Sequence, residues 1–325
     1  MTEPLFTDDE EYDRPRLAGH GSVRVRVPAK INLHLHVGPP RADGYHELTT
    51  VYQAIGLYDE LSARRGDTLV LTMEGEGAGE VSLDEDNLVI RAARALAEST
   101  GRDPHARLHL RKHIPVAGGL AGGSADAAAA LVACDQLWGT GLSRDELAGI
   151  AATLGSDIPF LVLGGTALGT GRGELVSPIL TGGHSWHWVL GIAFEGLSTP
   201  TVYRTFDELG GHGRTRARSA PDPGAGPPDG LLAALRQRDP EVLAGELAND
   251  LQTAALHLRP ELHRVLDAGM AAGSLAGMVS GSGPTCVFLA EDARHGALIA
   301  AELEASRCCR AVHTAVGPVP GARVL

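Results

Sequence analysis

The sequence predicts an α+β fold that is divided between two domains. The chain has 325 residues, which suits two domains or one large one. Segments in which apolar and polar residues alternate occur beside segments with an apolar residue at every third or fourth position, so strands and helices are mixed along the chain. Turn-rich connections between neighbouring strands favour antiparallel pairing. Hydrophobic residues make up 43% of the chain, which is enough for a sizeable core.

These patterns place the individual elements. Strands are predicted at residues 22–27, 30–37, 49–55, 59–63, 68–73, 107–110, 186–194, 276–279, 287–289 and 311–316. Helices are predicted at residues 87–99, 125–137, 143–155, 230–236, 240–247, 260–271 and 291–306. The acidic residues 1–20 have no period and are expected to be disordered. Residues 210–230, rich in Gly, Pro and Arg, are expected to form a flexible surface insertion.

A glycine-rich loop at residues 115–126 is the most informative segment. Four glycines within six positions allow the backbone to turn tightly and to approach a ligand closely. Ser124 is a favourable N-cap for the alanine-rich helix that follows. A glycine loop that leads into a helix N-terminus offers free N–H groups and a positive dipole end, so the segment predicts a phosphate site. It lacks both the P-loop and the dinucleotide-binding spacing, and a plain flexible connector is the alternative.

A strand beside this loop carries a polar face. After Pro28, a period of two separates aliphatic side chains from a polar row that is a candidate wall of a site, consisting of Lys30, Asn32, His34 and His36. The two alternating histidines are an alternative zinc-binding pair, but the sequence has no third metal-ligating residue at a spacing typical of a zinc site. Two histidines on a partly solvated strand face are therefore the favoured interpretation.

Lysine is rare in this chain, which uses arginine almost everywhere else. Only Lys30 and Lys112 are lysines among the 28 basic residues. A compact ammonium differs from a planar guanidinium where a point charge is needed beside a reacting group. Both lysines lie near the informative segments, so both are candidate site residues, with chance retention as the alternative.

Three turn segments supply further candidates. Residues 43–46, Asp-Gly-Tyr-His, leave a turn that follows the polar strand. Pro159 is expected to keep Ile158 out of a helix, which would leave Asp157 in a turn. Residues 280–284, Ser-Gly-Ser-Gly-Pro, are predicted to be either a further phosphate or substrate contact or a tight turn between two elements.

Charge and composition exclude several classes of partner. The net charge of −12 argues against nucleic acid and against an anionic membrane surface. The first residues lack the basic and apolar regions of a signal peptide, and no apolar run approaches membrane-spanning length. The four cysteines form no C-x-x-C pair. We therefore expect a protein of the reducing cytoplasm.

Four motifs, in their order and spacing, resemble one superfamily of small-molecule kinases. It is named after galactokinase, homoserine kinase, mevalonate kinase and phosphomevalonate kinase. The motifs are Pro-Ala-Lys-Ile-Asn-Leu at 28–33, Asp-Gly-Tyr-His at 43–46, the glycine loop, and Ser-Gly-Ser-Gly-Pro at 280–284. The first two are more specifically similar to the branch that phosphorylates 4-diphosphocytidyl-2-C-methyl-D-erythritol in the non-mevalonate isoprenoid pathway. The resemblance runs from about Val23 to the end of the chain, outside residues 1–20 and 210–230.

The resemblance implies a domain plan, a reaction and a set of site residues. A nucleotide-binding domain would cover residues 21–178 and a smaller α/β substrate domain residues 179–325, with the active site in the cleft. ATP and Mg²⁺ would be the cofactors, and no residue is assigned as a dedicated metal ligand. The implied catalytic pair is Lys30 and Asp157. The implied nucleotide-binding residues are Lys112, Pro115, Ala117, Gly118, Gly119, Leu120, Ala121, Gly122, Gly123, Ser124 and Ala125. The implied substrate-binding residues are Asn32, Tyr45, His46, Tyr203, Gly281 and Ser282.

The residues fit this chemistry. Phosphoryl transfer requires mainly positioning and charge neutralisation. Asp157 can accept the proton of a tertiary hydroxyl, and Lys30 can keep the aspartate ionised and stabilise charge on the moving group. We expect the enzyme to be a monomer or a weak homodimer. Two alternatives are a homoserine or mevalonate kinase of the same superfamily and a nucleotide-binding protein without turnover. The first does not need the Asp-Gly-Tyr-His segment, and the second does not need the catalytic pair.

Overall fold

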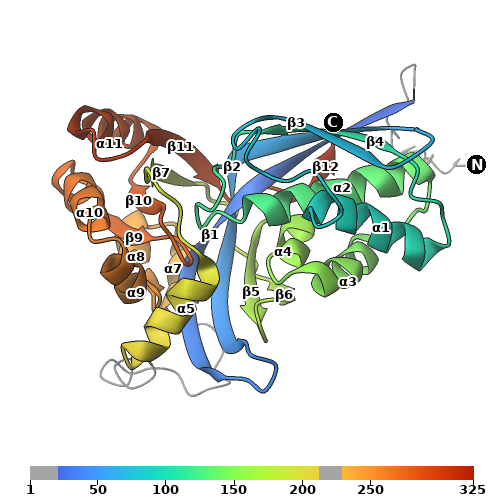
Figure 1. The fold of residues 1–325 in the computed structure, drawn as a ribbon. Coiled ribbons are helices and arrows are strands. Elements are labelled where there is room, and N and C mark those ends of the chain that lie inside the picture. The colour runs from blue at the N-terminus through green and yellow to red at the C-terminus, as the bar shows by residue number, and fades with distance from the viewer. Residues whose placement is uncertain (1–20, 212–228) are drawn as a thin grey trace, which may run out of the picture.

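The computed structural model describes residues 21–211 and 229–325, and it consists of two sheets that carry helices. The larger sheet and its helices occupy the right side of Figure 1, and the smaller sheet and its helices occupy the left side. The long strands β1 (Ser22–Pro40) and β2 (His46–Arg64) run through the middle of the molecule and connect the two parts. This is the mixed, two-part architecture that the sequence predicts.

The larger sheet has the central strand order β12-β1-β2-β4-β3. Strands β1 and β2 form an antiparallel pair along most of their length, whereas β3 and β4 are parallel. Strand β5 pairs with β2, β6 with β5, and β8 with β1. The remaining strands of this sheet are β3 (Val70–Gly75), β4 (Arg107–Lys112), β5 (Thr166–Thr170), β6 (Leu175–Pro178), β8 (Ala248–Asn249) and β12 (Arg323–Val324).

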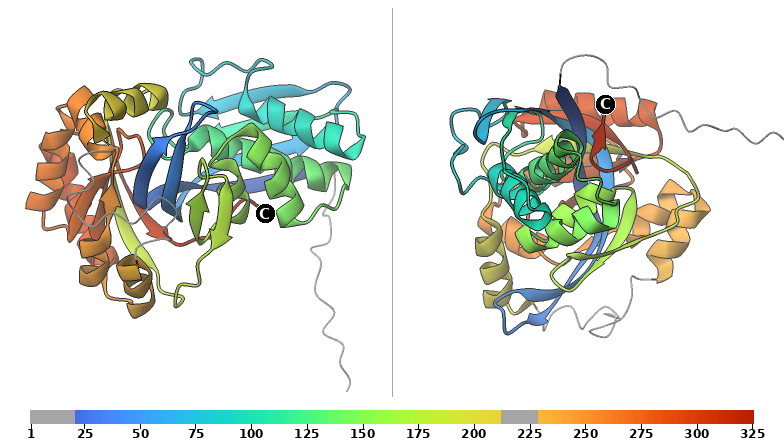
Figure 2. Two further views of the ribbon diagram at one scale, coloured as in Figure 1. Left: turned by 90° about the horizontal axis from the view of Figure 1, so that it is seen from below. Right: turned by 90° about the vertical axis from the view of Figure 1, so that its right-hand side faces the viewer.

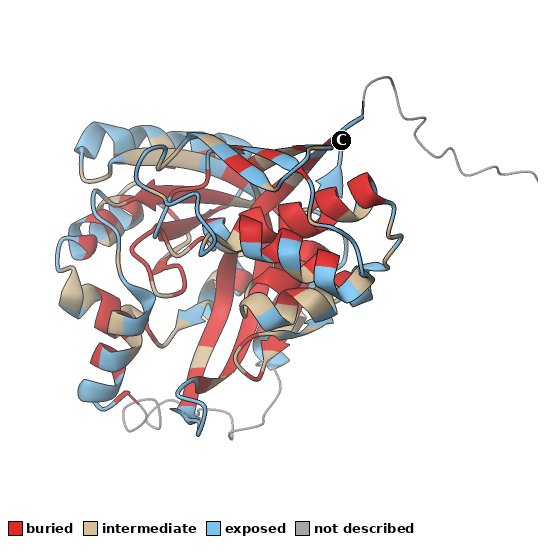
Figure 3. Cartoon of the chain, turned by 45° about the vertical axis from the view of Figure 1, so that its right-hand side comes forward, coloured by how far each residue is buried: buried red, intermediate tan, exposed pale blue. Residues whose placement is uncertain are grey.

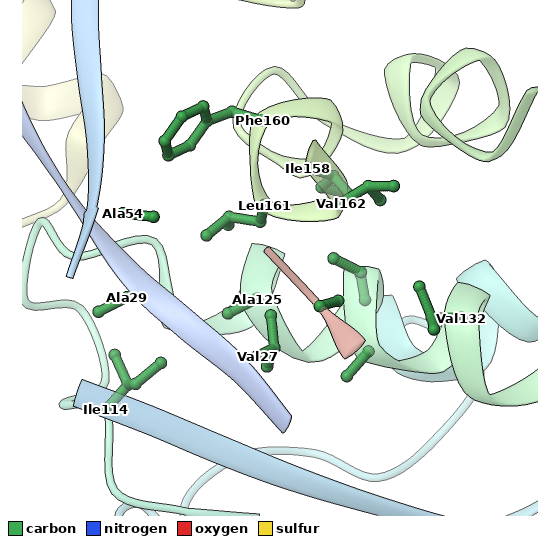
Figure 4. Packing of buried hydrophobic residues seen from close by; sticks show 14 of the residues in the cluster. Val27, Ala29, Ala54, Ile114, Ala125, Val132, Ile158, Phe160, Leu161 and Val162 are labelled. Carbon is green, nitrogen blue, oxygen red and sulfur yellow. The ribbon is translucent and has the colours of Figure 1, made fainter. Parts of the chain in front are cut away.

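Four helices accompany this sheet, and one of them is buried on nearly every side. Helix α2 (Gly122–Trp138) is rich in alanine, so the sheet and the neighbouring helices can approach it closely. In Figure 4, Ala125 on α2 lies among Val27 and Ala29 of β1 and Leu161 of α4. The other helices are α1 (Leu88–Thr100), α3 (Arg144–Leu154) and α4 (Ile158–Leu163).

The smaller sheet has the order β11-β7-β10-β9, and every pairing in it is antiparallel. Its strands are β7 (Trp186–Ile192), β9 (Ala276–Val279), β10 (Cys286–Ala290) and β11 (Ala311–Gly317). The helices of this part lie on the outer side of the molecule (Figure 2). They are α5 (Thr199–Glu208), α7 (Asp229–Gln237), α8 (Pro240–Glu246), α9 (Gln252–Leu258), α10 (Leu262–Ala271) and α11 (Ala293–Ser306).

The two parts share strands, so the predicted boundary at residue 178 does not separate them cleanly. That boundary falls between β6 and β7, but the short strands β8 and β12 return to β1 in the larger sheet. Figure 3 shows β1 and β2 largely in red, because both of them are buried between the two parts. None of the helices in the described part of the chain is long and apolar enough to cross a membrane.

Several element predictions are confirmed, and others are wrong for identifiable reasons. The helix predicted at 143–155 is α3, which begins after a capping box of Ser143 and Glu146 and ends before Gly155. Strand β1 continues through Pro28 with a register shift next to that residue, where the sequence predicted two strands. Strand β2 likewise continues where a turn was predicted, and helices α5 and α9 were not predicted. The predicted tail lies outside the described residues, as does nearly all of the insertion at 210–230.

Candidate active site

A pocket of about 860 Å³ lies where the two parts meet. Its walls come from β1, β2, the glycine loop, the start of α4, α5 and the loop between β9 and β10. It brings together most of the site residues that the sequence predicted. These are Lys30, Asn32, Tyr45, His46, Ala117, Gly118, Gly119, Ala121, Gly122, Gly123, Ser124, Asp157, Tyr203, Gly281 and Ser282.

Lys30 is held at the floor of this pocket by neighbours on β1 and β2. Its Nζ atom donates a hydrogen bond of 2.8 Å to Oδ1 of Asn32. Asn32 in turn donates to the hydroxyl of Thr50 at 2.8 Å, and Thr50 donates to the His34 carbonyl at 2.7 Å. Lys30 is only 5% exposed, so it is not a surface strand lysine. This chain of hydrogen bonds fixes the direction in which the ammonium points.

Asp157 approaches the same ammonium from the start of α4. Its Oδ2 atom lies 3.7 Å from Nζ of Lys30, and its side chain is 30% exposed. Asp157 occupies the N-cap position of α4 but makes no capping hydrogen bond. The carboxylate can therefore meet both the lysine and a ligand. Pro159 stands in the first turn of α4, where its missing N–H costs nothing, so the expectation that it excludes Ile158 from a helix is wrong.

Tyr52 lies beside the pair and remains neutral. Burial raises the pKa of the Tyr52 hydroxyl well above its usual value, and the negative charge of Asp157 raises it further. The ring stacks on Phe160 of α4 with centroids 4.9 Å apart. Tyr52 thereby links β2 to the helix that carries Asp157, and it offers a hydroxyl that stays protonated.

The glycine loop turns through three left-handed residues before α2 begins. Ala117, Gly119 and Ala121 have φ values of 53°, 74° and 58°. Residues 280–285 connect β9 to β10 and form the second loop of the site. A Cβ atom on Gly119 would overlap the carbonyl oxygen of Ser280, so only glycine permits this contact with the second loop. Ala121 is the N-cap of α2. The loop is thus held against both β1 and the second loop.

The first turn of α2 faces the pocket. Ser124 lies inside this turn, so the expectation that Ser124 is the N-cap is wrong. The helix starts three residues earlier than expected, because Gly122 and Gly123 accept helical dihedrals. The N–H groups at this helix start have no carbonyl partner within the helix. They lie at the positive end of the helix dipole, and this end faces the pocket. This geometry suits a phosphate group.

Lys112 lies beneath the loop and does not line the pocket. Its Nζ atom donates to Oδ2 of Asp59 and to Oδ2 of Asp126, each at 2.7 Å. Burial alone would lower the pKa of Lys112, but the two carboxylates outweigh this effect and raise it. Asp59 also accepts backbone hydrogen bonds from His113 and Ile114, at the start of the loop. The cluster therefore ties the beginning of the loop to α2.

Three further loop residues of the predicted nucleotide set also lie away from the pocket. Pro115, Leu120 and Ala125 are buried, and none of them lines the cavity. Leu120 and Ala125 are fully enclosed in the large core. The carbonyl of Leu120 accepts a 3.2 Å hydrogen bond from the backbone N–H of Lys30. These residues anchor the loop against β1 while their neighbours face the cavity.

The far end of the pocket carries aromatic rings. His46 at the start of β2 stacks on Tyr203 of α5, with centroids 5.3 Å apart and an angle of 26° between the rings. Nε2 of His46 lies 3.0 Å from Oδ1 of Asp207, one turn further along α5. Tyr45 is 52% exposed and lines the same end. Flat rings and a carboxylate next to them form a suitable surface for a heteroaromatic base.

The second loop brings backbone groups close to Lys30. The side-chain amide of Asn249 donates to the carbonyls of Val279 and Gly281 at 2.7 and 2.8 Å. The hydroxyls of Ser282 and Thr199 lie 2.9 Å apart, which links this loop to the start of α5. A Cβ atom on Gly281 would lie 3.3 Å from Nζ of Lys30. The smaller part of the molecule therefore closes the pocket directly over the lysine.

The polar strand face ends earlier than its alternation predicts. The pairing of β1 with β2 shifts between Asn32 and His34, and this irregularity exchanges the two faces of the strand. Leu35 therefore lines the pocket instead of His34. His36 lies 2.8 Å from Oδ2 of Asp250. In the described part of the chain, no group of three or more His, Cys, Asp or Glu side chains could hold a metal ion.

Sequence reasoning missed several residues of the pocket wall. They are Leu35, Leu48, Tyr52, Leu88, Ser156, Arg172, Leu197, Arg204, Asp207 and Leu251, among others. A helical pattern at 199–208 would have placed Arg204 and Asp207 next to Tyr203 on α5. Arg172 stands in a Gly-Arg-Gly turn, and this short pattern does not by itself indicate a function. Its position follows only from the pairing of β5 with β2.

The comparison with known proteins agrees with this geometry. A model of the GHMP kinase N-terminal domain matches residues 87–165, and a model of the GHMP kinase C-terminal domain matches residues 231–308. A protein of Salinispora tropica named 4-diphosphocytidyl-2-C-methyl-D-erythritol kinase is 68% identical over 324 residues, which covers 100% of both chains. The chain belongs to the 4-diphosphocytidyl-2-C-methyl-D-erythritol kinase branch of the GHMP kinase family.

Solved structures support the same family assignment. A crystal structure of 4-(cytidine 5'-diphospho)-2C-methyl-D-erythritol kinase has a TM-score of 0.71 and 32% identity, and the match covers 91% of this chain and 99% of that one. A homoserine kinase of Cytophaga hutchinsonii also reaches a TM-score of 0.71, but at 18% identity it shares only the fold. The predicted fold class and family are thus confirmed, and the chain is an ATP-dependent small-molecule kinase of the GHMP family.

Proposed function

We propose that this enzyme transfers a phosphoryl group from ATP to the tertiary 2-hydroxyl of 4-diphosphocytidyl-2-C-methyl-D-erythritol. The observation that carries the proposal is the position of Lys30 and Asp157, between the glycine loop on one side and the rings of His46 and Tyr203 on the other. A phosphate donor and a cytidine-bearing acceptor have separate suitable surfaces, and both surfaces open onto the same lysine and aspartate.

The two charged residues have complementary roles in this proposal. A tertiary hydroxyl is a poor nucleophile until its proton is accepted, and Asp157 is exposed enough to meet that hydroxyl. Lys30 stabilises the ionised aspartate and the negative charge that spreads over the transferred group. Asn32 fixes the direction of the ammonium, and the centre of the Tyr52 ring lies 5.6 Å from it. Positioning and charge neutralisation are the main requirements of phosphoryl transfer.

The loop residues would hold the triphosphate. The backbone from Ala117 to Gly119 and the first turn of α2 provide N–H groups, and Ser124 adds a hydroxyl at the pocket wall. Lys112 as a direct nucleotide ligand stays a prediction, since its ammonium is occupied by two carboxylates beneath the loop. Supporting the loop is the role that its contacts favour.

The donors in the pocket suit Mg²⁺ that arrives on the nucleotide. Mg²⁺ usually keeps several waters and binds one or two protein oxygens together with phosphates, so a cage of protein ligands is not required. Ser124 and Asp157 are oxygen donors at the pocket wall that could complete such a shell. When bound, Mg²⁺ neutralises the charge of the phosphates.

The pyrimidine would bind at the aromatic end. His46, Tyr45 and Tyr203 supply ring faces there, while Asn32, Gly281 and Ser282 lie nearer to the reacting hydroxyl. All of these residues belong to one chain, so a monomer can form the whole site, and a monomer or weak homodimer remains our proposal. The four cysteines are free thiols, which suits the proposed location in the reducing cytoplasm.

A direct assay separates this function from those of related kinases. The purified protein is incubated with ATP and Mg²⁺, and ADP release is followed with three acceptors, namely 4-diphosphocytidyl-2-C-methyl-D-erythritol, homoserine and mevalonate. We expect sustained ADP release with the first acceptor only. Turnover of homoserine or mevalonate without turnover of the cytidine compound would overturn the proposal.

A further inference from the structure

Two positively charged side chains in the pocket, Arg172 and Arg204, have no role in the mechanism above. The acceptor carries a diphosphate between its cytidine and its methylerythritol, so it brings negative charge to a protein whose own net charge is −12. Among the described residues that line the pocket, the lysine and arginine side chains are those of Lys30, Arg172 and Arg204. Lys30 already contacts Asn32 and Asp157. The two arginines are therefore the candidates for binding the diphosphate.

Of these two, Arg172 is the better placed for a bound diphosphate. The side chain of Arg204 is 65% exposed, and its Nε atom lies 3.9 Å from Oε1 of Glu208. The side chain of Arg172 is 29% exposed, and its guanidinium carbon lies 4.9 Å from the centre of the Tyr45 ring. Tyr45 directly precedes His46, so the guanidinium lies next to the proposed pyrimidine site.

The turn that carries Arg172 is fixed to β2. The backbone N–H of Gly171 donates to Oε1 of Glu47 at 3.1 Å, and the N–H of Leu48 donates to the carbonyl of Gly171 at 2.7 Å. Gly173 has a φ of 100°, and a Cβ atom there would overlap the hydroxyl of Tyr52. The turn thus contacts the residue beside Asp157, while its arginine reaches toward the pyrimidine end.

Glu174 holds one side of the guanidinium and leaves the other side available. Oε2 of Glu174 accepts the backbone N–H of Arg172 at 2.6 Å, and Oε1 lies 3.5 Å from Nε. Within residues 21–211 and 229–325, the two Nη atoms of Arg172 have no hydrogen-bond partner. A guanidinium offers parallel N–H groups whose spacing matches the oxygens of a phosphate.

We propose that Arg172 binds the diphosphate of the acceptor and thereby selects a cytidine diphosphate over cytidine alone. This inference rests on the proposed function. Tyr45 supports the guanidinium from one face, and Glu174 orients its Nε edge. The diphosphate then lies between the aromatic end and the catalytic pair. Arg172 is a specificity-determining residue in this arrangement and takes no part in proton or phosphoryl transfer.

Calorimetric titration with cytidine, CMP and CDP tests the inference. A saturating non-hydrolysable ATP analogue is present throughout, so that the glycine loop is occupied and the ligands compete only for the acceptor site. The wild type is compared with Arg172→Met and Arg172→Lys. The matched control is Arg111→Met, which removes an arginine that also pairs with a glutamate, Glu74 at 2.6 Å, but lies on β4 outside the pocket.

We expect Arg172→Met to weaken CDP binding about tenfold or more while cytidine binding stays unchanged. Arg172→Lys should recover part of the CDP affinity, because lysine restores the positive charge but lacks the parallel N–H groups of the guanidinium. Arg111→Met should bind all three ligands like the wild type. An Arg172→Met protein with wild-type CDP affinity would overturn the inference, and so would an equal loss for cytidine and CDP.

The same titration distinguishes this inference from the function on which it rests. A wild-type protein that binds none of the three cytidine ligands would contradict the proposed acceptor and leave no basis for Arg172 as its diphosphate ligand. A wild-type protein that binds CDP more tightly than cytidine, with no change in Arg172→Met, would contradict the role of Arg172 alone. Thermal melting of each variant confirms that the compared proteins are folded.

Discussion

Oδ2 of Asp157 lies 3.7 Å from Nζ of Lys30, although one residue stands at the start of a helix and the other in the middle of a strand. The hydrogen bond from Lys30 to Asn32 and the chain that continues through Thr50 fix the lysine side of this contact. The aspartate side is set by α4, whose Phe160 packs on Tyr52 of β2. Two separate elements are thereby held in register at the proposed reacting centre.

Asp157→Asn should lower kcat by about 10²–10⁴-fold, because the amide keeps the shape of the carboxylate but cannot accept the proton of the acceptor. Binding of both substrates should persist. Steady-state kinetics with the cytidine acceptor, together with titration of ATP and of the acceptor, provide the measurement. An Asp157→Asn enzyme with near-normal kcat would show that the hydroxyl needs no protein base.

Lys30→Met should cause a similar loss, and Lys30→Arg should also be badly impaired. A planar guanidinium is bulkier than an ammonium, and the space beside Gly281 and Asn32 is already narrow. If the two charged residues act as one unit, the double variant Lys30→Met with Asp157→Asn should be little slower than either single variant. A Lys30→Arg enzyme with full activity would mean that this lysine is not held against a reacting group.

Gly123→Val should weaken ATP binding without unfolding the protein. The nearest atom to a new Cβ at this position is in Leu88, 3.8 Å away, so the backbone tolerates a side chain there. That side chain would enter the pocket where a phosphate is expected. The measurement is the affinity for a non-hydrolysable ATP analogue. Gly149→Val in α3 is the matched control, because it also places valine at an open helical glycine. Equal affinities of the two variants for the ATP analogue would mean that the glycine loop does not bind the phosphates and only connects two elements.

His46→Ala should raise KM for the cytidine acceptor and hardly change KM for ATP. Comparable stacking contacts between proteins and bases contribute roughly 1–3 kcal/mol, which corresponds to about fivefold or more in affinity. The measurement is a pair of KM values for each substrate in the wild type and the variant. A rise confined to KM for ATP would mean that the two ligands are assigned to the wrong ends of the pocket.

Stability should decrease as the solution becomes acidic, because His34 is buried without a hydrogen-bond partner on either ring nitrogen. Burial lowers the pKa of His34 to about 4, and the opposing effect of Asp250 is smaller. The unfolded chain takes up a proton at His34 near pH 6.5, whereas the folded chain takes it up only near pH 4. Acid therefore favours the unfolded state, and the stability is lost as the pH falls through this window.

The full effect at His34 amounts to about 3 kcal/mol, of which about 2 kcal/mol should be lost between pH 7 and pH 5. Urea unfolding at these two pH values gives the free energies. His34→Phe should reduce the difference by this amount, and the control is the same substitution at His263, an exposed position on α10. A pH dependence that is identical in wild type and His34→Phe would contradict the assignment of this effect to the buried imidazole.

Local sequence signals predicted most of the described helices, but not α4, α5 or α9. The glycine loop and the helix that follows Ser143 both depend on residues close together in the chain, and the structure contains both, although α2 begins earlier than predicted. The catalytic pair and the aromatic residues came from the resemblance to known kinases. They meet in one pocket, as that resemblance implied.

The features that the sequence did not reveal depend on tertiary pairing. The exchange of faces after Asn32 arises from the register between β1 and β2, so alternation alone assigns His34 to the wrong side. Lys112 is bound by Asp59, which is distant in sequence, and does not line the pocket. Arg172 reaches the pocket because β5 pairs with β2, and β12 returns to β1 from the other end of the chain. No local pattern encodes these contacts.

The position of the new phosphate in the product tests the central claim most directly. The enzyme is incubated with ATP, Mg²⁺ and 4-diphosphocytidyl-2-C-methyl-D-erythritol, and the product is analysed by phosphorus and carbon NMR. We expect one new phosphomonoester, coupled to the methyl-bearing tertiary carbon, and its formation should be about 10²–10⁴-fold slower when Asp157→Asn replaces the wild type under the same conditions. A phosphomonoester at another hydroxyl, or ATP consumption that leaves this acceptor unchanged, would contradict the account.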